Sequence, residues 1–149
     1  MKAKEYLSRL KIMRAESDRI SLEINDIEKA REHVMAAEVL DQVQITELSN
    51  RLVNLYCRYV ELKEEYFTTY EEIMSRILAM PGVVERNVLY MRYVQGYSFR
   101  IISESLMYAE KYVMNAHGRA LQKFGQIWKT ELDAVPTPPL KNVQQRTQA

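Results

Sequence analysis

The first 80 residues of this 149-residue chain contain neither glycine nor proline. Pro81 and Gly82 are the first of each, and the whole chain has only four glycines and four prolines. These two residues disfavour a helix interior more than any others. A β-sandwich or a glycine-rich nucleotide-binding fold would need them in its turns. The sequence therefore predicts an all-α protein that begins with long helices.

The first predicted helix carries one apolar stripe, in which successive positions are four or three residues apart. This spacing places all of them on one face of a helix. The stripe comprises Tyr6, Leu10, Met13, Ser17, Ile20, Ile24, Ile27, Arg31 and Val34. Ser17 and Arg31 are its polar positions. A helix of about 32 residues is about 48 Å long, so it needs an equally long partner.

The second predicted helix begins after residues 36–46, with Asp41 or Thr46 as its N-cap, since either side chain can accept a free backbone N–H. Its apolar side chains form two adjacent rows, so it can contact two neighbours. One row comprises Leu48, Leu52, Leu55, Tyr59, Leu62 and Tyr66, and the other Val53, Tyr56, Val60, Phe67, Tyr70, Met74 and Ile77. We predict a long antiparallel hairpin over residues 1–80, whose second row makes a homodimer or covers the C-terminal part.

The predicted elements become shorter after Pro81 and Gly82. These two residues end the second helix, because proline cannot continue a helix and glycine tolerates an unusual backbone. An amphipathic helix is expected over residues 83–94, closed by a turn. A short helix follows over residues 99–106, and Ser98 is a suitable N-cap for it.

A tight turn separates the helix of residues 99–106 from a longer one over residues 109–128. Two such helices with a supporting helix before them form the helix-turn-helix plan. The positions predicted to face its core are Ile101, Ile102, Leu106, Val113, Ala116, Ala120, Leu121 and Phe124. We expect a small helix-turn-helix domain over residues 81–130 and a disordered polar tail over residues 131–149.

The net charge of +1 conceals an asymmetry between the two parts of the chain. Residues 1–80 have 12 basic and 15 acidic side chains, a balance of −3, whereas residues 81–149 have 9 and 5, a balance of +4. The second part is therefore the candidate for an anionic partner. The side chains predicted to lie outside on the last helix are Glu110, Lys111, Met114, Asn115, Arg119, Gln122 and Lys123. Such a face can work on DNA, because Asn and Lys can read base edges while Arg119 and Lys123 can neutralise phosphates.

Other chemistry finds little support in the sequence. The single cysteine, Cys57, has no neighbouring Cys or His with which to bind a metal. No catalytic constellation is present, so we expect no enzyme, no cofactor and no metal site. His117 is open to two interpretations, a phosphate contact or a packed helical side chain. No apolar run approaches the roughly 18 residues that span a bilayer, and we expect a soluble, cytoplasmic protein.

Several motifs resemble known proteins. The run LYMRYVQGYSFRIISESL, followed by HGRALQKF, resembles region 4 of bacterial sigma factors. The chain also begins with AKEYL and contains DQVQ between its two long helices. Together with HGRAL these motifs resemble a family of phage and prophage late-gene transcription regulators, of the ArpU and RinA kind, over about residues 3–128.

This resemblance implies a DNA-binding transcription regulator of phage late genes in a bacterial host. It implies that the helix over residues 109–128 is a recognition helix, which reads double-stranded DNA through Glu110, Lys111, Met114 and Asn115. It also implies that Ser98 and Arg100 touch the phosphate backbone of the DNA. The hairpin would dimerise or contact host RNA polymerase. Four positions depart from the family pattern. Met107 stands where the family tends to have glycine in the turn, and Ala109, Glu110 and Met114 replace positions that are more often polar or basic.

Two other functions remain open. The small subunit of a phage DNA-packaging terminase also combines a helix-turn-helix with long oligomerising helices, although it usually places the DNA-binding element first. A structural or adaptor protein would use its helices to bind another protein and would not need the DNA-binding face.

Overall fold

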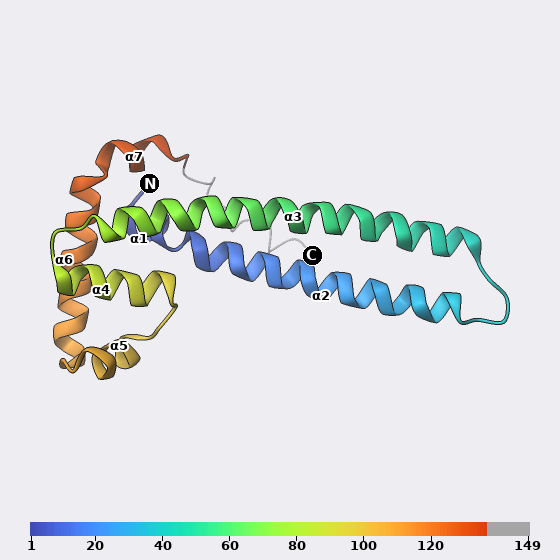
Figure 1. Ribbon diagram of the computed structural model, residues 1–149, viewed down its shortest axis with the longest axis horizontal. Coiled ribbons are helices and arrows are strands. Elements are labelled where there is room, and N and C mark those ends of the chain that lie inside the picture. Colours follow the sequence, from blue (N-terminus) through green and yellow to red (C-terminus); the bar gives the residue numbers. More distant parts are fainter. Residues whose placement is uncertain (137–149) are drawn as a thin grey trace, which may run out of the picture.

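The computed structural model describes residues 1–136, and that part of the chain is all-α, without a β-strand. Helices α2 (Arg9–Met35) and α3 (Gln42–Leu78) run antiparallel as a long hairpin (Figure 1). Shorter helices gather around the open end of the hairpin, opposite its tip. The predicted fold class, a long helical hairpin followed by short helices, is confirmed.

The two arms of the hairpin meet along the predicted stripe. Ile20, Ile24 and Ile27 of α2 pack against Leu52 and Leu62 of α3. The Oγ of Ser17 and the Nε of Arg31 are buried without a hydrogen-bond partner among the described residues. A buried polar atom without a partner destabilises a fold, so the two polar positions are the weak points of the interface.

The ends of the long helices follow from local chemistry. The carboxylate of Asp41 accepts a hydrogen bond from the backbone N–H of Gln44 at 3.1 Å, so Asp41 is the N-cap of α3 and Thr46 lies inside the helix. Ser8 separates α2 from a short first helix, α1 (Ala3–Leu7), so the predicted first helix is interrupted once.

The C-terminal part begins with α4 (Val83–Leu89), which continues into a π-helical turn, η1 (Tyr90–Val94). Gly82, the N-cap of α4, has an ordinary φ of −97°, so the predicted unusual backbone is wrong there. Gly96 does adopt a left-handed conformation, with φ +74°. The sequence pattern indicated an amphipathic segment over residues 83–94 but not its change to π geometry.

Three helices complete the described chain: α5 (Phe99–Leu106), α6 (Glu110–Ile127) and α7 (Lys129–Ala134). Helix α7 was not predicted. The prediction of a disordered tail from residue 131 is wrong at its start, because Leu132 belongs to α7 and is buried in the core. The leucine anchors a last helical turn where composition alone indicated disorder. The rest of the predicted tail, residues 137–149, lies outside the described residues.

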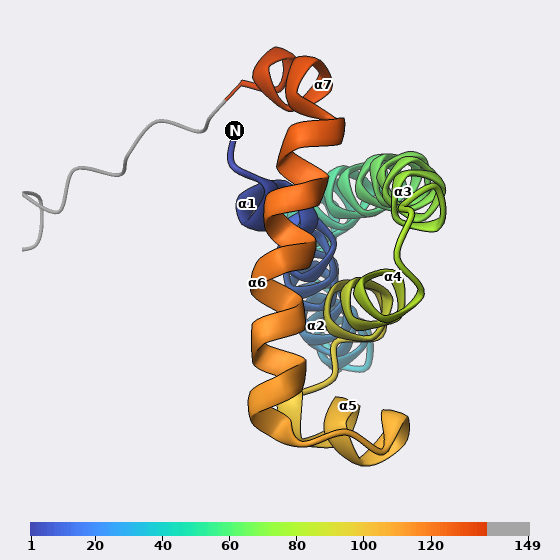
Figure 2. The same ribbon diagram turned by 90° about the vertical axis from the view of Figure 1, so that its left-hand side faces the viewer.

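One hydrophobic core joins the base of the hairpin to the C-terminal helices. Tyr6, Ile73 and Ile77 belong to the same buried cluster as Phe124 and Leu132. The rings of Tyr6 and Phe124 lie 5.9 Å apart between their centres, and α1 lies beside α6 (Figure 2). The chain boundary at Pro81 is therefore not a boundary in the packing.

Candidate nucleic-acid interface

Helices α5 and α6 are joined by a turn and pack together with α4 on a small core. Val88 of α4, Ile102 of α5, and Val113 and Ala116 of α6 make up that core. The hydroxyl of Ser98 accepts a hydrogen bond from the N–H of Ile101 at 3.3 Å, which confirms Ser98 as the N-cap.

One predicted core position of α5 is wrong. Ile101 is exposed, because a two-turn helix has room for a single inward stripe and Ile102 and Ser103 occupy it. On α6 the predicted core positions hold. Val113, Ala116, Ala120 and Phe124 are all fully buried, and Leu121 is partly buried at the edge.

The turn between α5 and α6 contains the strained residue Met107. Its φ of 59° and ψ of 38° are left-handed, and it is the only non-glycine residue with positive φ in the described chain. This conformation costs an L-residue about 1–2 kcal/mol. Met107 is 90% exposed, so packing does not compensate for the strain. The turn therefore has the shape that a glycine would adopt without cost.

The outer face of α6 is exposed at the positions that the sequence predicts to read DNA. Lys111, Asn115 and Gln122 lie on one stripe, because residues four and eleven apart return to the same side of a helix. All three are exposed, as is Met114 beside them. Helix α6 crosses the end of the molecule, in front of the hairpin and α4 (Figure 2). A partner can therefore approach this face without meeting the hairpin.

The remaining predicted contacts flank this stripe. Glu110 lies in the exposed first turn of α6. Ser98 and Arg100 are exposed at the start of α5, where Arg100 pairs with Glu104 at 3.4 Å. An ion pair so exposed contributes at most about 1 kcal/mol, so Arg100 can exchange it for a phosphate.

Arg119 and Lys123 lie on the side of α6 that faces α4. Both approach one carboxylate oxygen of Glu85, at 3.9 Å and 3.3 Å. A hydrogen bond from the backbone N–H of Glu85, together with Lys123 and Arg119, lowers the pKa of this carboxyl group. Glu85 is therefore charged at neutral pH, and it offsets part of the positive charge of the two side chains.

His117 lies on the other side of α6, against the C-terminal core. Its Nε2 lies 2.8 Å from the hydroxyl of Tyr93, and its ring packs edge-on against Phe99. Burial, then the positive charges of Arg92 and Lys4, lower the pKa of His117 to about 4. The histidine is therefore neutral at pH 7. Its contacts agree with the second of the two interpretations, a packed helical side chain, and not with a phosphate contact.

Comparison of the chain with protein-family models, with curated proteins and with solved structures gave no match in any of the three. In the described residues no helix has the length and apolar character to cross a membrane. In the same part of the chain, no three His, Cys, Asp or Glu side chains are grouped so that they could hold a metal ion. A proposal about function therefore depends on the exposed face of α6 and on the sequence motifs.

Proposed function

We propose that the protein is a sequence-specific DNA-binding transcription regulator that places α6 in the major groove. The observation that carries this proposal is the exposed stripe of Lys111, Asn115 and Gln122 on the second helix of a helix-turn-helix, clear of the hairpin. The major groove, about 12 Å wide, admits one α-helix. The motif resemblance to sigma region 4 and to phage late-gene regulators supports the same function in the cytoplasm of a bacterial host.

Each side chain of this face has a role that its chemistry allows. Lys111 and Asn115 donate hydrogen bonds to base edges, with Asn suited to adenine and Lys to guanine. Met114 supplies an apolar contact for a thymine methyl group, and Glu110 can accept a hydrogen bond from cytosine. Ser98 and Arg100 lie where the first helix meets the phosphate backbone.

Arg119 and Lys123 contact phosphates in this proposal by leaving Glu85. Glu85 then competes with the DNA for both cations, so Glu85→Gln should tighten DNA binding and make it more sensitive to salt. Glutamine keeps the size of the side chain at the start of α4. The control is Glu61→Gln, which removes an exposed carboxylate on the hairpin. Equal affinity of wild type and Glu85→Gln would show that the two cations do not reach the DNA.

The hairpin supplies the protein contacts of the proposed regulator, first of all with a second copy of the chain. Val53, Tyr56, Val60 and Phe67 form one exposed stripe along α3, because they follow at steps of three, four and seven residues. They are part of the predicted second row, and no described segment covers them. Contact of this stripe with host RNA polymerase is the competing use.

Light scattering separates these uses. If the stripe makes the dimer, the wild type is a dimer and Val60→Glu makes it monomeric. Leu22→Glu, on the exposed side of α2, is the control and should leave the dimer intact. Cys57 lies on the same exposed side of α3 and provides an oxidative cross-link as a second readout. A monomer at micromolar concentration contradicts the dimer, and ring-sized oligomers favour the terminase small subunit instead.

Selection of binding sites tests the proposed function directly. The full chain is incubated with a pool of random duplex DNA at low salt, and the bound fragments are sequenced. The proposal predicts an enriched motif, and a two-fold repeat of it if the protein dimerises. Recovery of DNA without any enriched sequence contradicts sequence-specific reading, and no recovery contradicts DNA binding altogether and favours the adaptor function.

A further inference from the structure

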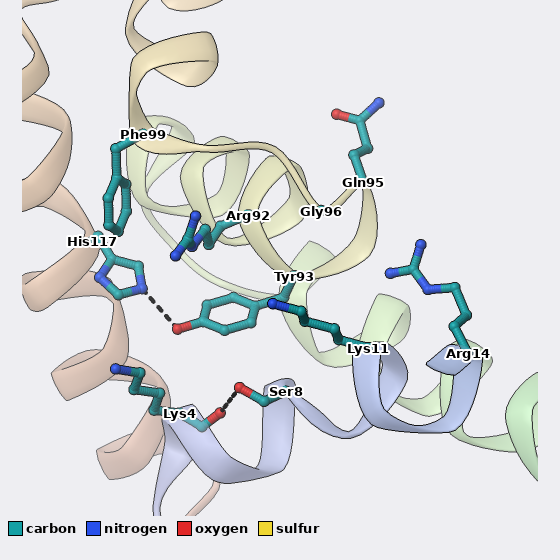
Figure 3. A pocket seen from close by; sticks show the side chains of 10 residues that line it. All are labelled: Lys4, Ser8, Lys11, Arg14, Arg92, Tyr93, Gln95, Gly96, Phe99 and His117. Atoms are coloured by element: carbon teal, nitrogen blue, oxygen red, sulfur yellow. Dashed lines mark hydrogen bonds between the residues drawn. The ribbon is translucent and has the colours of Figure 1, made fainter. Parts of the chain in front are cut away.

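A partly open pocket of about 590 Å³ lies where the hairpin meets the C-terminal helices. Its walls come from α1 and the start of α2, from η1 and the turn after it, and from the start of α5 and the middle of α6 (Figure 3). Four of its ten lining residues are Lys or Arg, and none is Asp or Glu. The volume is within the range of small-ligand sites, about 300–1,000 Å³.

The positive side chains come from different elements. Lys4, Lys11 and Arg14 belong to the helices that begin the chain, whereas Arg92 belongs to η1. Arg14 donates a hydrogen bond to the carbonyl of Val94 at 3.3 Å, and Arg92 donates one to the carbonyl of Tyr97 at 3.1 Å. Backbone carbonyls thus position both guanidinium groups without neutralising their charge.

Aromatic rings form the inner wall of the pocket. Tyr93 and His117 stack with 5.6 Å between ring centres, and the guanidinium of Arg92 lies 4.3 Å from the centre of the Phe99 ring. The positive charges of Arg92 and Lys4 lower the pKa of His117 beyond the effect of burial. The field of these cations therefore reaches the inner wall. A negative group in the pocket would meet an attractive potential and no carboxylate.

The geometry points to a binding site for a small phosphate-bearing anion in this pocket, whose cationic side chains are Lys4, Lys11, Arg14 and Arg92. Guanidinium and ammonium groups that line one concave site without a carboxylate among them are suited to phosphate oxygens. The pocket is not a continuation of the DNA-reading face, because His117 lies about 120° or more around α6 from Lys111 and Asn115. A π-helical turn at a pocket wall agrees with a ligand site, since such turns are frequent at functional sites.

The anion would contact two segments that are far apart in sequence. Lys4, Lys11 and Arg14 belong to α1 and the start of α2, and Arg92 belongs to η1, before α5 and α6. A bound phosphate would reduce the repulsion among the four cations. Binding of the anion itself does not depend on the proposed function, because the test is a titration with pyrophosphate that contains no DNA.

Proton NMR of the histidine rings is the local test, because the chain has only two histidines. His117 lies in the wall of the pocket, whereas His33 is exposed in the last turn of α2, near the hairpin tip. Inorganic pyrophosphate is titrated into the full chain at constant ionic strength. The proposal predicts that the His117 resonances shift and that the shift saturates with a Kd for pyrophosphate below about 1 mM, while the resonances of His33 stay unchanged.

Two charge variants complete the test. Lys11→Gln combined with Arg14→Gln should weaken pyrophosphate binding at least about tenfold, whereas Lys29→Gln, on the exposed face of α2, should leave it unchanged. Far-UV circular dichroism of each variant verifies the helical fold. The proposal is overturned if pyrophosphate shifts neither histidine, if it shifts both equally, or if the double variant binds pyrophosphate as tightly as the wild type does.

Discussion

The strained turn of the helix-turn-helix gives the sharpest prediction about stability. Met107 holds a left-handed backbone, at a cost of about 1–2 kcal/mol for an L-residue. Met107→Gly removes that strain, and the side chain, 90% exposed, makes little packing contribution. Glycine also gives the unfolded chain more freedom, which costs about 0.4–1 kcal/mol. The mid-range values of these two terms give a net gain of about 0.8 kcal/mol in the free energy of unfolding.

Urea denaturation followed by circular dichroism measures this gain as a higher midpoint at an unchanged slope. Met107→Ala is the matched control, because alanine keeps the strain and should change the stability little. Gln122→Gly is the second control, since Gln122 is exposed in the interior of α6, where glycine costs about 1 kcal/mol. If Met107→Gly destabilises the protein as much as Gln122→Gly does, the turn is not left-handed at residue 107 and the reasoning is refuted.

Three further predictions concern the core, a helix cap and the response to acid. Phe124→Ala should lower the free energy of unfolding by about 3–5 kcal/mol. In urea denaturation the hairpin and the C-terminal helices of this variant should unfold in one transition, and separate transitions would contradict their shared core. Asp41→Ala should cost about 1 kcal/mol, and Thr46→Ala, measured in the same way, less. The pKa of His117 falls from 6.5 to about 4 on folding. As the pH is lowered through that range, the unfolded chain therefore takes up the proton first and the free energy of unfolding decreases. Urea denaturation at several pH values should show that His117→Phe lacks this part of the decrease.

The elements that were predictable from sequence are those set by local chemistry. The absence of Gly and Pro before Pro81 and the seven-residue spacing of apolar side chains predict the hairpin, and the side chains of Asp41 and Ser98 mark two helix starts that the structure confirms. The exposed face of α6 was predictable for the same reason, since one stripe of apolar residues on a helix leaves the opposite side to solvent.

The errors arise where long-range packing decides. Leu132 forms a helical turn only because the core offers it a place, and nothing in its own neighbourhood indicated that. Ile101 is as apolar as Ile102, and only the direction of α5 on α6 decides which one is buried. The interruption of α4 by η1 likewise has no local signal.

The basic pocket was hidden by the charge balance. Lys4, Lys11 and Arg14 belong to the part of the chain that carries a net charge of −3, and Arg92 is far away in sequence. Their spacing of seven and three residues does indicate one helix face. Only the fold, which brings η1 beside the start of α2, shows that four cations share one pocket without a carboxylate.

The most direct test of the proposed function compares binding to two duplexes, the selected site and a scrambled one, by fluorescence anisotropy at several salt concentrations. The account predicts that Lys111→Ala combined with Asn115→Ala reduces the preference for the selected site by about 1–3 kcal/mol for each base that the two side chains read. Lys123→Ala should weaken both duplexes equally and reduce the salt slope by about 1. Lys29→Ala is the control. An unchanged preference in the double variant would contradict the claim that α6 reads DNA.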